Sequence, residues 1–208
     1  WSSDVCSSDL MPVWIVENTE HGNKSYSNFN EGLGKVLRYG ANSPEVILRL
    51  KWIEETLATV CRLSLENRGE LELKPLIGQA LHMGDECHNR NVASTALLIK
   101  QLIPSVIKTN LPPDDIASTV EFMSGNDLFF LNLSMAACKS MMDAAHGIDN
   151  SSMVTAMARN GVTFGIRMSG TGNEWFWTKS RVADGLFFPG FSQNDAAPDL
   201  GDSAITET

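Results

Sequence analysis

The fold of this chain is most constrained by a helical pattern that begins at Ser43. The string Ser43-Pro44-Glu45 is typical of a helix start, because serine caps free backbone N–H groups, proline suits the first helical position and an acid suits the first turn. Apolar side chains then recur at helical spacing, at Val46, Leu50, Ile53, Leu57 and Val60. We therefore expect a helix over residues 43–66, ended by Asn67-Arg68-Gly69.

Further helical patterns follow the first one. We expect helices over residues 74–83, from a cap at Asp85 to Pro104, over 112–123, over 126–146 and, as a last short helix, over 150–160. Gly84 and Gly147 are expected at helix ends, and Pro104 is expected to kink or end its helix. Residues 128–142 are apolar nearly all round, which is typical of a helix inside the core.

Strand patterns precede and follow these helices. Val13-Trp14-Ile15-Val16 is β-branched and aromatic, so we expect a strand, followed by a polar connection over 18–28 that suits a hairpin. A short helix over residues 31–39, closed by Gly40, then leads to the helical pattern. Near the other end we expect a strand over 162–168, a turn over 169–173, a returning strand over 174–178 and an aromatic loop over 187–191.

These patterns predict an α+β protein with a central helical domain flanked by partial α/β segments. The expected parts are residues 11–42 as the end of an α/β domain, 43–160 as the helical domain and 161–208 as the start of a truncated α/β domain. Residues 1–10 resemble the translation of a sequencing adapter, so we expect them to be disordered. The chain is accordingly interpreted as a fragment of a larger multidomain protein.

The composition narrows the classes of partner. The 208 residues carry a formal net charge of −9, which argues against nucleic acid because phosphate backbones require basic patches. No apolar run approaches the length of a membrane span, so no membrane partner is expected. Cys61, Cys87 and Cys138 are widely spaced and form no Cys-x-x-Cys pair, which favours a reducing, cytoplasmic setting.

The strongest candidate for a functional site is the polar run, residues 82–91, which reads His-Met-Gly-Asp-Glu-Cys-His-Asn-Arg-Asn. It lies between two apolar helical patterns, where polar groups cost free energy unless they bond one another or a ligand. Arg90 suits a carboxylate or phosphate, and His82 or His88 can move a proton near neutral pH. The alternative is a network that satisfies itself, with Asp85 as a plain helix cap.

The backbone decides how the polar run is displayed. If one helix continues through it, His82, Asp85, Glu86 and Asn89 share a face. If the helix breaks at Gly84, the run becomes a junction whose free backbone N–H groups can hold an anion. A metal site built from His82, Asp85 and His88, completed by Glu86 or His146, matches no established ligand spacing, so neither a metal nor another cofactor is expected.

Other motifs give weaker signals. Residues 30–35, Asn-Glu-Gly-Leu-Gly-Lys, lack the first glycine of a phosphate loop and the hydroxyl residue after its lysine, so a simple turn and a pocket-lining loop both remain open. Arg167 precedes a Gly-rich turn that can approach a ligand closely, although a plain hairpin turn is favoured. Asp202 and Ser203 lie in a Gly/Pro-rich loop. There is no Gly-x-Ser-x-Gly elbow and no His-Glu-x-x-His helix.

An ordered set of strings resembles the AllG-like family. The set comprises residues 30–46 (NEGLGKVLRYGANSPEV), Lys74-Pro75-Leu76, Met83-Gly84-Asp85-Glu86, His88-Asn89-Arg90-Asn91, Gly125-Asn126-Asp127, residues 165–170 (GIRMSG) and Gly201-Asp202-Ser203. The resemblance covers nearly everything after Met11 and implies an α+β fold with a helical domain. It also implies that the chain is the middle portion of a protein about twice as long.

The resemblance implies an activity, because the family includes a subunit of oxamate carbamoyltransferase. That enzyme converts oxalurate and phosphate into oxamate and carbamoyl phosphate in allantoin breakdown, and it needs companion subunits. The resemblance therefore implies a site for small planar anions, and the residues match these roles by type alone. His82, His88 and Asp85 are the catalytic candidates, and the candidates for substrate binding are Glu86, Asn89, Arg90, Asn91, Asn126, Arg167, Asp202 and Ser203.

Two further classes of function stay open. The chain can be a non-catalytic member of a multi-subunit complex, in which the helical part binds a metabolite or a partner. It can also be a metal-dependent hydrolase, which would contain bound zinc or iron.

Overall fold

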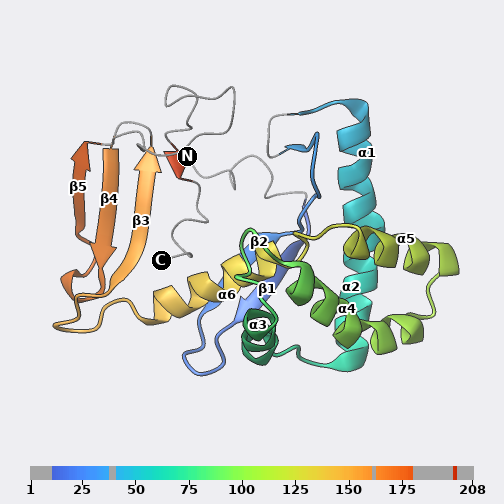
Figure 1. The fold of residues 1–208 in the computed structure, drawn as a ribbon, viewed down its shortest axis with the longest axis horizontal. Helices are drawn as coiled ribbons and strands as arrows, with labels where there is room; N and C mark the ends of the chain where they lie inside the picture. The colour runs from blue at the N-terminus through green and yellow to red at the C-terminus, as the bar shows by residue number, and fades with distance from the viewer. Residues whose placement is uncertain (1–10, 38–40, 161–162, 180–198, 201–208) are drawn as a thin grey trace. The chain divides into compact units, whose positions relative to one another are not determined.

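The computed structural model describes residues 11–37, 41–160, 163–179 and 199–200 (Figure 1). It combines helices with small antiparallel sheets, which confirms the α+β class. The chain divides into two compact units, one made of Ser7–Val16 and Tyr26–Ala137, the other of Trp1–Cys6, Glu17–Ser25 and Cys138–Thr208. We call them the helical unit and the sheet unit and describe each by itself.

The elements follow one another in this order. The helices are α1 (Pro44–Trp52), the π-helical turn η3 (Ile53–Leu57), α2 (Ala58–Arg68), α3 (Leu73–His82), α4 (Val92–Val106), the 3-10 helix η4 (Ile107–Thr109), α5 (Pro113–Ser124), α6 (Leu131–Ala144) and the 3-10 helix η5 (Ser169–Thr171). The strands are β1 (Val13–Glu17), β2 (Lys24–Asn28), β3 (Val154–Asn160), β4 (Thr163–Met168), β5 (Trp175–Lys179) and β6 (Asp199–Leu200).

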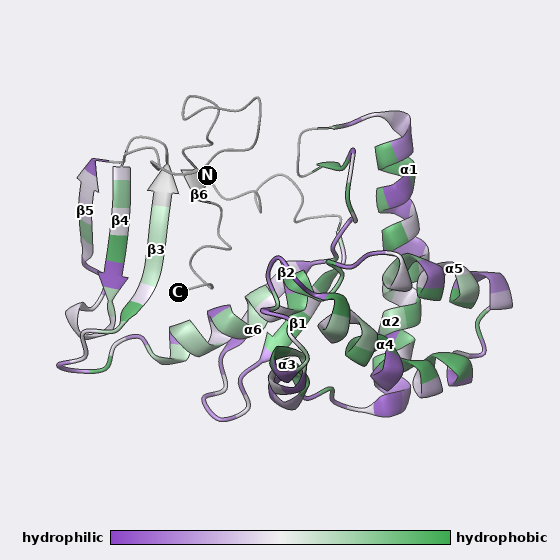
Figure 2. Cartoon of the chain, in the orientation of Figure 1, coloured by the Kyte–Doolittle hydropathy of each residue, from purple (hydrophilic) through white to green (hydrophobic). Residues whose placement is uncertain are grey.

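The first helical pattern forms one long element, because α1, η3 and α2 follow one another without a break. Ser43 takes the N-cap position and Pro44 the first helical position, as expected. The expected side-chain cap is wrong, because the Ser43 hydroxyl bonds no N–H among the described residues, and the Ser43 carbonyl accepts the N–H groups of Val46 and Ile47 instead. Gly69, with a φ of 86°, ends the element one residue after Arg68. Figure 2 shows hydrophobic and hydrophilic residues intermixed along α1 and α2, as in a helix with one apolar side. The predicted start and end are confirmed.

The later helices begin and end close to the expected residues, with three differences. The helix α4 begins at Val92 with Asn91 as its N-cap, instead of directly after Asp85. It also continues past Pro104 to Val106, and the carbonyl that loses its partner belongs to the exposed Lys100, where water is available. The helix α6 begins at Leu131 rather than at Asn126, because residues 126–130 form turns in which the Asn126 side chain accepts the Leu128 N–H at 3.2 Å.

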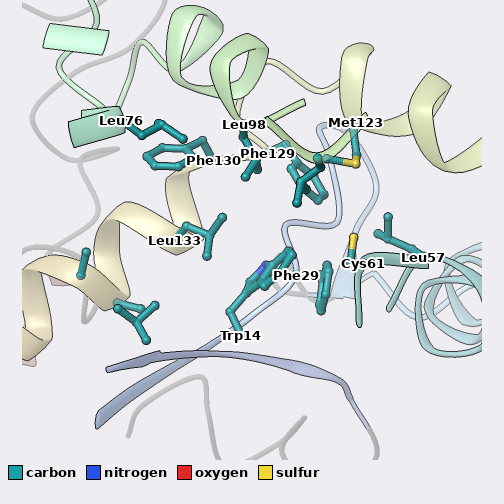
Figure 3. Close-up of a cluster of buried hydrophobic side chains, with 14 of the residues drawn as sticks. Trp14, Phe29, Leu57, Cys61, Leu76, Leu98, Met123, Phe129, Phe130 and Leu133 are labelled. Atoms are coloured by element: carbon teal, nitrogen blue, oxygen red, sulfur yellow. The ribbon is translucent and has the colours of Figure 1, made fainter. Parts of the chain in front are cut away.

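The core of the helical unit is aromatic at its centre (Figure 3). Trp14 and Phe29 lie with their ring centroids 4.3 Å apart, and each ring lies 6.4 Å from Phe129. Phe122 packs edge-on to Phe129 at 6.2 Å. Such tilted and edge-to-face pairs add to the stabilisation from apolar burial. The hairpin strands and α5 are thereby joined to one core.

Both sheets are antiparallel. The hairpin of β1 and β2 confirms the expected first strand and its hairpin connection. The second sheet has the order β5-β4-β3-β6, with Met157 opposite Ile166 and Gly165 opposite Trp177. A Cβ on residue 165 would lie 3.1 Å from the Trp175 ring, so glycine lets the two strands pair without displacing that ring. The strand, turn and returning strand expected near residues 162–178 are confirmed.

Two expectations about local structure are wrong. Residues 154–160 form β3 instead of part of a short helix, because pairing with β4 outweighs the helix propensity of alanine, methionine and arginine in this segment. Residues 31–36 form a loop instead of a helix, since Gly32 and Gly34 have φ values of 89° and 95°, which a right-handed helix cannot contain. The loop expected over residues 187–191 lies outside the described residues.

Two further findings bear on function. Among the described residues, no helix combines the length and the apolar character needed to cross a bilayer. Among the described residues, Cys61, Cys87 and Cys138 form no disulfide bond. Burial raises the pKa of the Cys61 thiol to about 12, so this cysteine stays protonated and is excluded as a nucleophile.

The aromatic core predicts a large loss of stability when its central ring is removed. We expect Phe129→Ala to lower the free energy of unfolding by roughly 3–5 kcal/mol, because it leaves a cavity among rings that cannot collapse fully. The matched control is Leu48→Ala on the exposed side of α1, expected to change it by about 0.5 kcal/mol or less. Urea denaturation measures both, and equal losses would contradict the placement of Phe129.

Candidate functional site

The polar run forms a junction between α3 and α4. The helix α3 ends at His82, and Gly84 follows with a φ of 98°. The N–H of Gly84 donates to Leu81 O and the N–H of Asp85 donates to Ala80 O, both at 3.1 Å, which is the Schellman arrangement of a helix end. The glycine therefore breaks the helix, and the junction rather than the continuous helix is formed.

A carboxylate occupies the beginning of α4. Oδ2 of Asp85 accepts the backbone N–H of Ser94 at 2.7 Å and its hydroxyl at 2.9 Å. Ser94 is the third residue of α4, so Asp85 satisfies a free N–H of that helix across nine residues of chain. Asp85 is 8% exposed. The protein's own carboxylate thus takes a position at which we expected a bound anion to be held.

The middle of the polar run turns inward. Cys87 is buried and has a positive φ of 61°, unusual for a residue with a side chain. Its N–H donates to Arg90 O at 3.0 Å, and its carbonyl accepts the hydroxyl of Ser134 from α6 at 2.6 Å. Asn91 is fully buried and donates to His88 O at 2.5 Å. These bonds close the run into a compact turn and leave only some of its side chains outside.

Glu86 and Arg90 form a doubly bonded pair on the exposed side of the turn. Oε2 of Glu86 lies 2.7 Å from Nη2 of Arg90, and Oε1 accepts the backbone N–H of Arg90 at 2.6 Å. Arg90 also donates from Nε to Gly84 O at 3.2 Å. The backbone N–H of Arg90 is the main cause that holds the pKa of the Glu86 carboxyl below its ordinary value, with smaller contributions from the N–H groups of Asn89 and His88 and from the guanidinium.

The two histidines of the run differ in exposure. His82 is exposed, and its Nδ1 lies 2.8 Å from Gly78 O. A carbonyl oxygen only accepts, so Nδ1 carries the hydrogen and Nε2 of the neutral ring is left as the basic atom. His88 is half-buried and Asn89 is exposed. An imidazole nitrogen, an amide and the Glu86–Arg90 pair are therefore the groups of this turn that a solute can reach.

Asn126 belongs to a different group of buried amides in the helical unit. Its Nδ2 donates to Asn30 Oδ1 at 3.0 Å. Asn30 in turn donates to Asn132 Oδ1 at 3.0 Å, and Asn132 donates to Asn28 O at 2.8 Å. These hydrogen bonds connect the segment after β2 to α6 and to Asn126, which precedes α6. Sequence reasoning missed Asn30 and Asn132 because their partners are about a hundred residues away.

Arg167 lies in the sheet unit, on β4. Its guanidinium lies over the Trp175 ring of the neighbouring strand, with 5.9 Å between the guanidinium carbon and the ring centroid. Its Nε is buried and, among the described residues, has no hydrogen-bond acceptor. Its carbonyl accepts the hydroxyl of Thr155 at 3.4 Å, and that hydroxyl also lies 3.1 Å from Nδ1 of His146. Asp202 and Ser203 lie outside the described residues.

The described residues contain no cluster of side chains suited to bind a metal ion. Within residues 11–37, 41–160, 163–179 and 199–200, no three or more His, Cys, Asp or Glu side chains are placed to hold one ion. Asp85 is committed to Ser94 and Glu86 to Arg90. Sequence reasoning did not foresee Ser94, although a serine in the first turn of a helix is a common partner for such a carboxylate.

Comparison with known proteins gives consistent matches. The family model described as "Oxamate carbamoyltransferase subunit AllG" matches residues 4–203. The Escherichia coli K12 protein of that name is 48% identical over 204 residues, covering 97% of this chain and 48% of the relative. The uncharacterized E. coli protein YahG is 45% identical, covering 97% and 43%. The crystal structure of a conserved protein of unknown function from Enterococcus faecalis V583 superposes with a TM-score of 0.87 at 43% identity, covering 97% and 48%.

The Asp85 contact predicts a measurable cost of removing the cap. We expect Asp85→Ala to lower the free energy of unfolding by roughly 1–3 kcal/mol, because the buried N–H of Ser94 loses its acceptor. Asp114→Ala, in the exposed first turn of α5, is the control and should cost about 1 kcal/mol or less. Ser94→Ala removes the hydroxyl bond to Asp85 and keeps the backbone N–H bond, so its loss should be smaller than that of Asp85→Ala, and the two losses should be less than additive in the double variant. Additive losses in urea denaturation would refute the bond between the Ser94 hydroxyl and Asp85.

The Glu86 contacts predict a particular pH dependence. Since its pKa is lowered in the folded protein, Glu86 stabilises the fold above its unfolded pKa, and this contribution is lost as pH falls through the lower folded value. In Arg90→Gln the backbone N–H at position 90 remains, so the pKa should rise only partly and stay below the ordinary 4.5. Carboxyl carbon NMR titration of Glu86 measures both values. A full return to 4.5 would show that the guanidinium dominates.

Proposed function

This chain belongs to the AllG family, and we propose on that basis that it is a subunit of an oxamate carbamoyltransferase-type enzyme. The observation that carries the proposal is the family match over residues 4–203 together with 48% identity to the E. coli subunit over 97% of the chain. The chain spans about half the length of the curated relatives it matches. The family name describes a subunit, so companion subunits are part of the proposal. Three cysteines that form no disulfide among the described residues favour a reducing, cytoplasmic setting.

The proposed reaction makes specific demands on a site. A phosphate oxygen bonds to the carbamoyl carbon of oxalurate, the bond from that carbon to the oxamate nitrogen breaks, and that nitrogen takes up a proton. Both reactants are anions, so the site must hold negative charge and supply the proton. A guanidinium, an imidazole and amide groups meet these demands.

The accessible groups of the α3–α4 turn are assigned first. Arg90 would bind the carboxylate of oxalurate or the phosphate, which requires it to exchange its Glu86 partner for the substrate. Nε2 of His82, the basic atom of its neutral ring, would carry the proton, with His88 as the alternative carrier. Asn89 would address the carbamoyl amide. Among the described residues, Glu86 is the one side chain that Arg90 has to release for this to occur.

The buried groups of the set are assigned positioning roles. Asp85 holds the start of α4, and Asn91 and Asn126 bond other parts of the helical unit. Arg167 remains a candidate for binding an anion because its buried Nε has no acceptor among the described residues. Asp202 and Ser203 are retained from the sequence as candidates for substrate binding.

A second function is favoured by one observation. Most polar side chains of the turn are already bonded within it, with Asp85 on Ser94, Glu86 on Arg90 and His82 on Gly78. A turn stabilised in this way also suits a non-catalytic subunit, in which it binds a metabolite or a companion subunit.

A double substitution separates the two functions. In the assembled complex, His82→Ala with Arg90→Ala should reduce carbamoyl phosphate formation by about a hundredfold or more while the complex keeps its mass, because proton transfer and anion binding typically each contribute that order. Turnover is measured from oxalurate and phosphate, and assembly by light scattering.

The control is Arg62→Ala, which breaks an exposed pair of the same i,i+4 spacing and 2.7 Å separation on α2. It should leave turnover and assembly unchanged. Loss of assembly with residual turnover in the double variant would favour the non-catalytic function. Normal turnover and normal assembly would refute the role of the turn in both.

A further inference from the structure

In the glycine loop, residues 32–36, the sign of the backbone φ angle alternates from residue to residue at the start of the loop. Gly32 and Gly34 have φ values of 89° and 95°, whereas Leu33 between them has a negative φ. The chain bends sharply at residues 33–35. Successive residues of opposite hand direct their N–H groups towards one side of a concave turn, the arrangement called a nest, which suits an anion.

The N–H groups of this loop are left without acceptors. The N–H of Gly32 donates to Asn30 Oδ1 at 3.0 Å, and the N–H of Leu37 donates to Glu31 Oε2 at 2.9 Å. Between them, the N–H groups of residues 33–36 donate to no acceptor in the part of the chain that the structure describes. Leu33 is 68% exposed, and Gly34 and Lys35 are exposed as well, so a solute can reach this backbone.

Buried side chains hold the loop in this shape. Asn30 is 1% exposed and bonds both Asn126 and Asn132, while Val36 is completely buried. Glu31 is buried and ties its side chain to the N–H of Leu37. The ends of the loop are therefore fixed by contacts on the protein side, and the open N–H groups are preorganised rather than formed on binding.

Two cations accompany the loop. Nη1 of Arg49, on α1, donates to Glu31 O at 3.3 Å and would lie 3.5 Å from a Cβ at Gly32. The guanidinium lies over the Phe122 ring at 5.9 Å, which orients its plane and leaves Nε and Nη2 without a partner among the described residues. Lys35 adds a second positive charge. The carboxylate of Glu31 is already bonded to the N–H of Leu37.

We propose that the glycine loop and Arg49 bind a phosphate group, either as inorganic phosphate or as the phosphoryl end of a small metabolite. Backbone N–H groups spread over several residues suit the divergent oxygens of a tetrahedral anion, and a guanidinium adds a charge-assisted bond. The proposal stands on this loop and does not depend on carbamoyl transfer or on the α3–α4 turn.

The test is a titration of the intact protein, labelled with 15N, with inorganic phosphate. We expect saturable shifts of the Leu33, Gly34 and Lys35 amide signals that sodium chloride at equal ionic strength does not produce. A second titration uses carbamoyl phosphate. Tighter binding of inorganic phosphate identifies the free ion as the ligand, and tighter binding of carbamoyl phosphate identifies the phosphoryl end of a metabolite. Absence of saturable shifts with both compounds would overturn the proposal.

Matched variants identify the groups responsible. Arg49→Gln should weaken phosphate binding about tenfold, the loss of one charge-assisted hydrogen bond. Lys51→Gln removes the same charge from the same helix and should have no effect on phosphate binding.

Gly34→Ala should abolish the amide shifts because alanine resists the positive φ. Gly22→Ala, at another positive φ in open space, should leave the amide shifts unchanged. Equal effects of Arg49→Gln and Lys51→Gln would overturn the assignment. Variants of the α3–α4 turn that lose turnover but bind phosphate normally would concern the proposed function and leave the proposal for the glycine loop unchanged.

Discussion

A buried carboxylate has to be matched by hydrogen-bond donors, and the contact of Asp85 with Ser94 meets this demand at the start of α4. The rest of the polar run is arranged around this contact. Gly84 first ends α3 so that the chain reverses, and Cys87 then accepts a positive φ so that its carbonyl meets Ser134. The exposed positions of Glu86, Asn89 and Arg90 are consequences of this buried framework.

The buried amides around Asn30 apply the same principle to the glycine loop. Asn126, Asn30 and Asn132 bond in sequence, and each bond joins segments about a hundred residues apart. An amide that bonds on both sides fixes the distance and the angle between segments, which an apolar contact does not. Polar contacts of this kind determine the shape of both surface turns of the helical unit, while the aromatic cluster around Phe129 supplies the stabilisation.

Local signals in the sequence were sufficient for the helices and insufficient for β3. Ser43, Pro44 and Gly69 act on their immediate neighbours, so the long helix could be predicted from them. The pairing of β3 with β4 depends on a second segment of the chain, which the local pattern of residues 154–160 does not reveal. The candidate site shows the same division. Its place in the sequence followed from residue types, but which polar groups are bonded within it depended on Ser94, Gly78 and Ser134.

Two of the arginines that face solvent in the helical unit, Arg49 and Arg90, differ in what surrounds them, and this decides how each can bind an anion. Arg90 is already paired with Glu86, so an anionic ligand must displace a carboxylate and gains only the difference between two similar interactions. Arg49 contacts a carbonyl and a ring, and among the described residues it has no carboxylate partner. On a chain with a net charge of −9, an arginine without an acidic partner is where a small anion finds a favourable local potential. Arg49 is therefore suited to permanent anion binding, and Arg90 to binding that requires an exchange of partners.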